Sequence, residues 1–354
     1  MNNQKYWENR ATWEMYETME KAERAADNIS AIYLKSSRWL QLEMEGIFEK
    51  YKTKHGLSDQ EAEMLLSKLN DKTSIQEMLQ ELKNGSGEKT KRELLTELEA
   101  PAYQARISRL MELQNQIDWV MKTVYQQEKM QSTAFYENLA KDAYYRTVFD
   151  TQKRTGLAFS FARVSNKQID HVLSMNWSGK HYSERIWKNT GDLAQALKEE
   201  MVVSLITGRT ERETAELIEK QFSSGSMQAR RLVRTESAFI SGELTAKAYE
   251  ECNLEKYRFL ATLDLRTSKI CRELDGKVFL VSERKVGTNY PPMHPWCRST
   301  TISIIDEETL ARLERRAYNP KTGRTELVSA TMTYDEWYKK YVKNNPEEAS
   351  KGGE

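Results

Sequence analysis

Apolar residues in the first part of the chain recur at the spacing of an α-helix. Over residues 4 to about 51, intervals near three and four separate Ile29, Ile32, Tyr33, Leu40, Met44, Ile47, Phe48 and Tyr51. Such intervals place side chains on one side of a helix, where they can be buried together. We predict one long helix or two in this segment, ended by Gly56.

A second long helix is predicted from Pro101 to about Arg154, because proline suits a first helical turn and Thr155-Gly156 suits a stop. Its apolar residues follow a spacing of 3, 7, 3 and 4 through Ile107, Leu110, Ile117, Val120 and Val124. This is close to a heptad seam, so we expect a helical hairpin or a coiled-coil-like arm. Between the two helices, capping boxes are expected at Ser58/Glu61 and Thr73/Gln76, and a flexible loop at residues 85–87.

Shorter helices are expected over residues 157–205, where the helical pattern is interrupted more often. A capping box at Ser165/Gln168 and an N-cap at Ser183 would begin two of them. Gly208 would end a helix and Thr210/Glu213 would begin the next. We expect Gly225-Ser226 to interrupt that helix and a new one to run over residues 227–251.

The pattern changes near Lys256 to short β-type runs bounded by turn residues. Residues 257–263, 277–281 and 300–305 are predicted strands of a small antiparallel sheet against the preceding helix. After Asp306 we expect a polar tail with one short docking helix, over residues 334–341. The predicted fold class is α+β, with a helical arm or docking region (1–156), an α+β module (157–305) and the tail (306–354).

Composition narrows the class of protein. The 354 residues suggest roughly two domains, and only 15 glycines and 6 prolines favour long helices. A net charge of +1 gives no overall attraction to nucleic acid or anionic lipid. Three cysteines, an odd number, argue against a disulfide framework and for a reducing compartment. No apolar signal region or run of about 20 apolar residues is present, so we expect no membrane segment.

Metal-ligating residue types gather between Asp264 and Arg298. This segment holds two of the three cysteines, one of the four histidines and three of the six prolines. Cys271, His294 and Cys297 are three candidate ligands for structural zinc, and Asp264 or Cys252 would supply a fourth. The alternative is that both cysteines are small buried apolar residues and that His294 bonds a backbone carbonyl.

Two catalytic interpretations of the same segment stay open, although neither is supported by a known spacing. Cys271 or Cys297 could be a nucleophile, with His294 as base and Asp264 as orienting group. Alternatively, His294 and Asp264 could hold a divalent ion in a nuclease or other hydrolytic enzyme. The residue types alone do not establish the geometry that either reaction needs, so we assign no catalytic residue.

A structural interpretation competes with both. Asp264 would cap the turn that contains Arg266 and Thr267, a common role for a short carboxylate. Arg298 and Arg234 would pair with Glu236 or Asp264 and hold the sheet on its helix. Such ion pairs contribute more to specificity than to stability.

Residues 141–188 form a local basic stretch with nine Lys or Arg against four acidic residues and many interleaved aromatic residues. Such a stretch can contact DNA phosphates without reading sequence, although a solvated helical face is the favoured explanation because its net charge of +5 is modest. No Gly-rich phosphate loop is present, which argues against an NTP-driven motor. The candidate nucleic-acid contacts are Arg146, Lys153, Arg154, Arg163, Lys167, Lys180, Arg185 and Lys188.

The order of short motifs resembles a known family. Arg234-Thr235-Glu236 comes first, then Asp264-x-Arg266-Thr267, Cys271, Gly276-Lys277-Val278, and finally Pro292-x-His294-Pro295-x-Cys297-Arg298. Over residues 160–305 this series is similar to the phage Mu F-type head morphogenesis family, the minor head or minor capsid proteins of tailed bacteriophages. The long helices before it resemble that family more loosely.

This resemblance implies a virion component in the capsid interior or near the portal, made in the host cytoplasm. It implies a role in procapsid assembly, with portal, major capsid or scaffolding protein as partners. In some members of the family, the role also includes binding of double-stranded DNA during packaging or ejection. Some relatives carry a toxin or transferase domain after this module, and we expect none after Arg298. The resemblance gives the Cys and His positions no chemical role.

Overall fold

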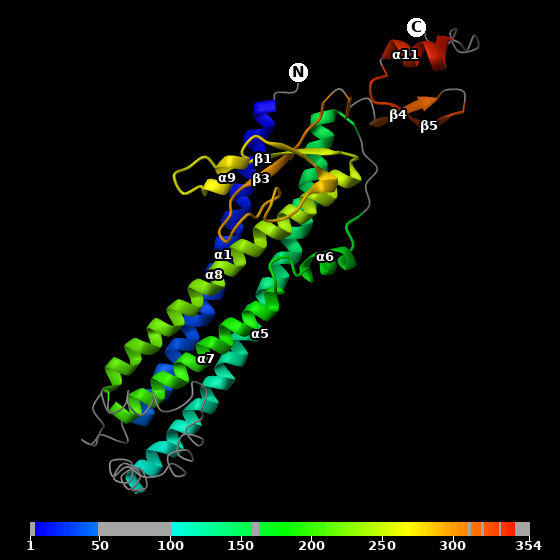
Figure 1. Ribbon diagram of the computed structural model, residues 1–354. Coiled ribbons are helices and arrows are strands. Elements are labelled where there is room, and N and C mark those ends of the chain that lie inside the picture. Colours follow the sequence, from blue (N-terminus) through cyan, green and yellow to red (C-terminus); the bar gives the residue numbers. More distant parts are fainter. Residues whose placement is uncertain are drawn as a thin grey trace. The chain divides into compact units, whose positions relative to one another are not determined.

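The computed structural model describes residues 4–48, 101–157, 163–207, 209–306, 308–309, 313–319, 322–332 and 334–343. Long helices come first in the chain, and a small antiparallel sheet follows (Figure 1). The predicted α+β class with long N-terminal helices is therefore confirmed. Within the described ranges, no helix is both long enough and apolar enough to cross a bilayer.

The two long helices begin and end close to where the sequence predicts. α1 is one continuous helix, Gln4–Phe48, and α5 spans Pro101–Thr155. α5 ends where Gly156 takes a φ of 67°, a conformation that glycine adopts without steric cost. The expected capping boxes at Ser58/Glu61 and Thr73/Gln76 and the loop at 85–87 lie outside the described residues.

Two predicted capping boxes are confirmed. The Ser165 and Gln168 side chains bond each other's backbone N–H groups before α6 (Asn166–Leu173). Thr210 and Glu213 do the same at the start of α8 (Glu211–Glu251). The predicted N-cap at Ser183 is wrong, because α7 (Tyr182–Thr207) already begins one residue earlier. The expected stop at Gly208 falls on a residue outside those described, and α7 ends at Thr207 beside it.

The expected interruption at Gly225-Ser226 is also wrong, since α8 runs through both residues. A Cβ atom on Gly225 would lie 2.9 Å from Leu193 Cδ2 and 2.9 Å from Tyr33 Cε1. Glycine therefore allows neighbouring helices to approach α8 closely, and it does not end the helix. The intrinsic helical cost of glycine, about 1 kcal/mol, is outweighed by this packing.

The three predicted strands form one antiparallel sheet in the order β2-β1-β3. β1 is Lys256–Leu260, β2 is Val278–Leu280 and β3 is Thr300–Ser303. Tyr257 pairs with Phe279 on one side and with Ser303 on the other. The short helix α9, Lys269–Leu274, connects β1 to β2, and the 3₁₀ turn Val281–Glu283 follows β2. The central strand β1 thus positions both connections that carry the candidate site.

The segment after Asp306 contains a β-hairpin, so the expectation of a polar tail with only a short helix is incomplete. β4 (Glu314–Asn319) pairs antiparallel with β5 (Arg324–Ser329), and Gly323 in the turn has a φ of 66°. The predicted short helix begins at the expected residue, as α11 (Tyr334–Trp337) continued by a π-helical turn, Tyr338–Lys343. The Gly323 turn signal was present in the sequence but the flanking runs are too polar to mark strands.

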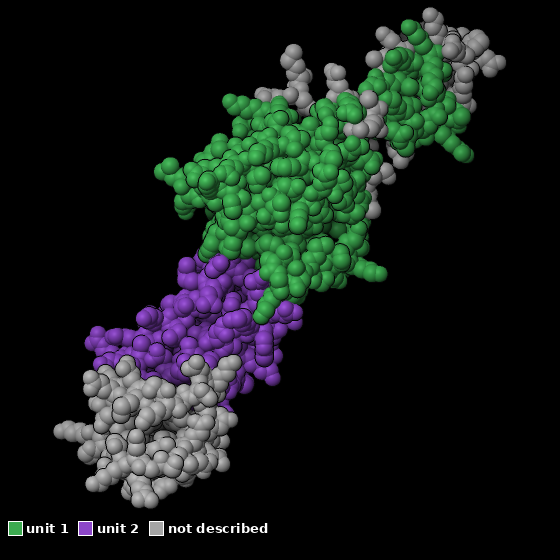
Figure 2. Space-filling view, viewed as in Figure 1, with its two compact units in different colours: residues 1–23, 134–181, 233–354 green, residues 24–133, 182–232 purple. Residues whose placement is uncertain are grey.

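The chain divides into two compact units of interleaved segments, coloured in Figure 2. Unit 1 consists of residues 1–23, 134–181 and 233–354, and unit 2 of residues 24–133 and 182–232. The described part of unit 2 is helical, with a core that includes Ile29, Leu40, Ile117, Val124 and Phe222. Unit 1 contains the sheet, and its core includes Phe239, Tyr249, Tyr257, Phe259 and Tyr290. The domain boundaries expected at residues 156 and 305 stay predictions.

Candidate functional site

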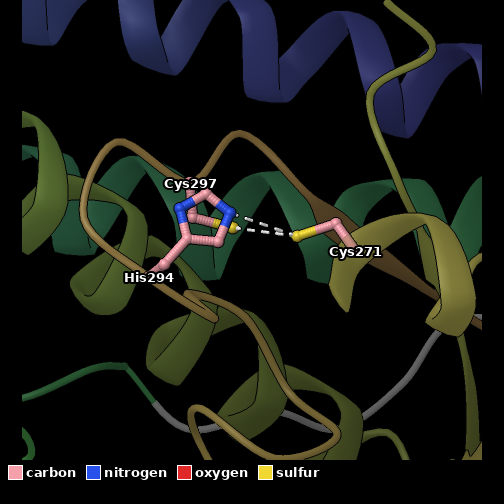
Figure 3. Close-up of side chains that lie close together, drawn as sticks. All are labelled: Cys271, His294 and Cys297. Atoms are coloured by element: carbon pink, nitrogen blue, oxygen red, sulfur yellow. Dashed lines mark hydrogen bonds between the residues drawn. The ribbon is translucent and has the colours of Figure 1, made fainter. Parts of the chain in front are cut away.

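Three side chains from two connections of unit 1 converge beside the sheet. Cys271 lies in α9, and His294 and Cys297 lie in the loop before β3. Cys271 Sγ is 3.4 Å from His294 Nε2 and 3.9 Å from Cys297 Sγ. Figure 3 shows the imidazole and both sulfur atoms pointing toward one another. We call these three residues the thiol–imidazole cluster.

Local hydrogen bonds hold both parts of the cluster in place. Ser268 caps α9, because its Oγ accepts the Cys271 backbone N–H at 3.3 Å. In the other segment, the Cys297 N–H donates to the His294 carbonyl at 3.2 Å. Between them Trp296 has a φ of 64°, in the left-handed region that few non-glycine residues adopt. This turn directs His294 and Cys297 to the same side of the loop.

The cluster is buried at its sulfur atoms and partly open at its imidazole. Cys271 and Cys297 are each 1% exposed and pack with Phe259 and Ala261, whereas His294 is half-buried. A hydrogen bond from the Cys297 thiol stabilises a Cys271 thiolate and lowers the pKa of Cys271. The same hydrogen bond, together with burial, raises the pKa of Cys297.

This arrangement can hold a soft metal ion or share protons between two thiols. The sulfur separation of 3.9 Å is far beyond the disulfide bond length of about 2.05 Å, and all three cysteines are free. The ligand atoms of the cluster all lie within 4.8 Å of one another. In the described part of the chain, the group with metal-site geometry contains neither Asp264 nor Cys252.

Asp264, predicted as a fourth ligand or an orienting group, instead forms an ion pair. Its carboxylate accepts two bonds from the Arg298 guanidinium, one of them 2.8 Å long. Asp264 Oδ1 also accepts the Arg266 N–H at 2.9 Å and the Thr267 hydroxyl at 3.1 Å. The Arg298 contact lowers the pKa of the Asp264 carboxyl. The carboxylate therefore fixes the turn at 264–267, as the structural interpretation of the sequence proposes.

Gly276 ends the same connection where the chain returns toward the sheet. Its φ of 75° favours glycine, and its N–H donates to the Phe259 carbonyl at 2.9 Å. The neighbouring Asp275 accepts the Ala261 N–H at 2.8 Å, a contact that sequence reasoning missed. Ser268 and Ser299, which also bonds Cys271, were missed as well. Of these, only Ser268 carried a recognisable signal, as a serine that precedes a short helix.

The motif Arg234-Thr235-Glu236 connects α8 to the loop that carries the cluster. Thr235 Oγ1 accepts the Trp296 N–H at 3.3 Å, and the Arg234 guanidinium lies 5.4 Å from the centre of the Trp296 ring. Arg234 forms its ion pair with Glu23, so the expected pairing with Glu236 or Asp264 is not the one present. Glu236, which is 5% exposed, accepts the Trp177 indole N–H at 3.1 Å.

Three prolines, Pro291, Pro292 and Pro295, lie in this loop. The bond between Pro291 and Pro292 is cis. The Pro295 carbonyl lies 2.7 Å from His294 Nδ1. Since a carbonyl only accepts hydrogen bonds, His294 Nδ1 carries a proton, and Nε2 is the ring nitrogen that faces Cys271.

The candidate nucleic-acid residues do not share one environment. Arg154 is buried and donates to Ser303, Arg146 pairs with Glu17 and Asp142, and Lys188 pairs with Asp192. Lys153 lies over the Phe149 ring. The side chains of Arg163, Lys167 and Lys180 are exposed in unit 1, whereas Arg185 belongs to unit 2 and is half-buried. The exposed basic surface is thus smaller than the sequence count indicates.

Part of this chain is similar to a known protein family. Residues 195–302, which include the thiol–imidazole cluster, match the family described as Phage Mu protein F like protein. An NAD(+)–arginine ADP-ribosyltransferase EFV of Enterococcus faecalis is 26% identical over 68% of this chain and 50% of its own length. A protein of Haemophilus influenzae, described as uncharacterized, is 22% identical over 53% of this chain and 43% of its own length. The chain thus spans half or less of each of these relatives.

Among solved structures, a computationally designed three-helix bundle covers 70% of this chain and 94% of its own, at 15% identity. Its TM-score of 0.14 gives it no weight for the fold.

Proposed function

Because residues 195–302 are phage Mu protein F-like, we propose that the protein is a minor head protein of a tailed bacteriophage that acts in procapsid assembly beside the portal. The family match carries this proposal, and it covers both the RTE motif on α8 and the Asp264–Arg298 segment. The proposed location is the capsid interior or the portal vicinity, and the proposed partners are the portal and the major capsid or scaffolding protein.

Exposed aromatic side chains on α1 support an assembly role. Trp13 and Tyr16 are 60% and 54% exposed, and their rings stack at 5.3 Å. Neighbouring large apolar side chains on a surface are typical of a protein–protein contact. We propose that this pair contacts the portal protein in the assembled head.

Contact with packaged DNA is a secondary part of the proposal. Lys153, Arg163 and Lys167 are exposed in unit 1, where each can contact a phosphate. Since Arg146 and Arg154 are engaged with protein groups, we expect such contact to be weak and independent of base sequence.

The proposal does not include catalysis. A nuclease site of the kind considered for this segment needs a carboxylate beside His294, and the Asp264 carboxylate is instead paired with Arg298. The transferase named among the relatives is about twice as long as the segment it shares with this chain, and its activity is that protein's own.

Deletion of the gene from the phage that encodes it tests the proposed function. We expect the wild-type protein in purified procapsids at low copy number, and a loss of infectious particles by orders of magnitude on deletion. Restoration by a plasmid-borne wild-type copy is the control. Normal titre after deletion, together with absence of the protein from purified heads, would contradict the proposal.

The aromatic pair is tested in the same complementation assay. Trp13→Ser with Tyr16→Ser should leave the protein folded but reduce its incorporation into heads. The control is Trp187→Ser, which removes a side chain of similar exposure, 61%, from unit 2. Equal incorporation of the wild type, the Trp13/Tyr16 double variant and the Trp187→Ser control would exclude the α1 pair as the portal contact.

A further inference from the structure

We propose that Cys271, His294 and Cys297 bind a zinc ion through two thiolates and one imidazole nitrogen, with water in the fourth position. This inference concerns the residues of the cluster and does not depend on the proposed role in phage heads. Zinc would connect α9 to the loop before β3. Cys271 and His294, the ligands from these two segments, are 23 positions apart in the sequence.

Two of the three separations between ligand atoms in the cluster fit tetrahedral zinc. Zn–S bonds of about 2.3 Å and Zn–N bonds of about 2.0–2.1 Å place two sulfur ligands about 3.8 Å apart and a sulfur–nitrogen pair about 3.5 Å apart. The observed separations are 3.9 Å for Cys271 Sγ to Cys297 Sγ and 3.4 Å for Cys271 Sγ to His294 Nε2. Both lie within about 0.2 Å of these expected separations. The third pair, His294 Nε2 and Cys297 Sγ, lies within 4.8 Å.

The tautomer of His294 also fits. Its Nδ1 lies 2.7 Å from the Pro295 carbonyl oxygen, which can only accept, so Nδ1 carries the hydrogen. The lone pair of Nε2 is left for a metal, on the side where Cys271 lies. A second ring nitrogen that donates to a carbonyl is the usual support for a histidine ligand, because it fixes the ring and its basicity.

The ligands are held by groups other than a metal. Ser268 caps the turn that carries Cys271, and Thr235 accepts the Trp296 N–H beside Cys297. The Thr262 hydroxyl donates to the Arg298 carbonyl at 2.8 Å, immediately after the loop. Such prior fixation reduces the conformational cost of binding an ion.

Ligand chemistry selects zinc over the common hard cations. Two thiolates and an imidazole suit zinc, whereas magnesium and calcium prefer oxygen ligands. In the described part of the chain the group offers three ligands, which leaves a coordination position open. The half-buried His294 places this group within reach of water. On binding, each thiol releases its proton to solvent and the thiolate forms a bond to the ion.

The experiment uses the full chain, produced without a histidine tag under reducing conditions and supplied with zinc. We expect about one zinc ion per chain by elemental analysis, for the wild type and for the control Cys252→Ser. Cys252 is equally buried but lies outside the cluster. Cys271→Ser and Cys297→Ser should retain little zinc, and His294→Ala should lose it readily to a chelator.

Two measurements on the wild-type protein guard against variants that fail to fold. Removal of zinc by a chelator should lower the melting temperature by roughly 5–15 °C, and added zinc should restore it. Cobalt(II) in place of zinc should give the visible bands and sulfur charge-transfer absorption of a tetrahedral thiolate site. A wild-type protein without zinc, a melting temperature indifferent to chelation, or a Cys271–Cys297 disulfide in the reduced preparation would each overturn the proposal.

Discussion

Unit 2 and the sheet region of unit 1 both contain polar side-chain contacts, but these contacts have different neighbours. In unit 2, the Tyr33 hydroxyl donates to Glu128 at 2.6 Å between α1 and α5, among the apolar residues of a helical core. In unit 1, Asp264–Arg298, Thr235–Trp296 and Arg154–Ser303 hold loops and strand ends that have little apolar periodicity. Apolar packing surrounds the polar contact in unit 2, whereas polar contacts hold the loops and strand ends of unit 1.

Steric substitutions should therefore act most strongly in unit 2, and the largest effect is expected at Gly225. Gly225→Val places methyl groups against Tyr33 and Leu193. Even a Cβ atom alone at this position would lie 2.9 Å from each of these side chains. Overpacking of this kind costs about 3 kcal/mol in the free energy of unfolding. Chemical denaturation monitored by circular dichroism measures it.

The control for this substitution lies in α7. A Cβ atom on Gly191 would meet nothing within 4 Å, so Gly191→Ala should stabilise the protein by up to about 1 kcal/mol through helix propensity. If Gly225→Val were as stable as the wild type, the close approach of Tyr33 and Leu193 would not be the reason for glycine at this position. The core of unit 2 would then be more adaptable than its packing indicates.

Loss of a polar anchor should give the next largest effect, in unit 1. Arg154→Gln removes the bonds of 2.8 and 3.0 Å from Arg154 to the Ser303 hydroxyl and carbonyl and leaves buried acceptors unpaired. We expect a loss of about 2 kcal/mol in the free energy of unfolding. The neighbouring Lys153→Gln removes the same charge from an exposed position and should change stability by less than about 0.5 kcal/mol.

The same two variants separate structural from DNA-binding roles for this basic stretch. Affinity for duplex DNA, measured by fluorescence anisotropy over a range of salt concentrations, should fall for Lys153→Gln and not for Arg154→Gln. Each lost phosphate contact reduces the slope of log K against log salt by about 0.9. The reverse order, with Arg154→Gln stable but defective in DNA binding, would contradict the anchoring role of Arg154.

The smallest expected effect depends on pH and concerns Glu128 in unit 2. Burial raises the pKa of Glu128 to about 7, and the bond from Tyr33 only partly opposes this shift. The folded state therefore holds a proton that the unfolded state has lost above about pH 4.5, so the wild-type protein loses stability as pH rises from about 4.5 through 7. Glu128→Gln cannot ionise and should avoid that loss.

We expect Glu128→Gln to be more stable than the wild type by about 1–2 kcal/mol at pH 8, with an advantage that shrinks toward pH 4.5. Urea unfolding at several pH values measures it. Glu219→Gln, at an exposed position of α8 in the same unit, is the control and should show no such trend. A Glu128→Gln variant less stable than the wild type at pH 8 would mean that the ionised carboxylate is favourably solvated in place.

Prediction from sequence worked best where one local rule decided the outcome. The bounds of α5 follow from Pro101 and Gly156, and the capping boxes at Ser165 and Thr210 are formed as expected. Within the described residues, the stripe positions Ile29, Ile32, Tyr33, Leu40 and Met44 are buried, as their spacing requires. The three strands of the sheet were found because short β-type runs alternate there with turn residues.

The failures have physical causes of their own. The low helix propensity of glycine predicts a helix break at Gly225. The close packing against Tyr33 and Leu193 that keeps glycine there depends on distant segments and cannot be predicted from the local sequence. The β4–β5 hairpin was missed because five of the six β5 residues are exposed, so burial leaves little apolar signal in that strand.

The sequence by itself determined the helices, the sheet and the composition of the candidate site, because periodicity, caps and turn residues act over a few positions. Only the tertiary structure decided which side chains contact one another. It separated Asp264 from the cluster by pairing it with Arg298, directed Arg154 to Ser303 rather than to solvent, and brought Cys271 to His294 and Cys297. These choices depend on which distant segments meet when the sheet packs, and no local pattern records them.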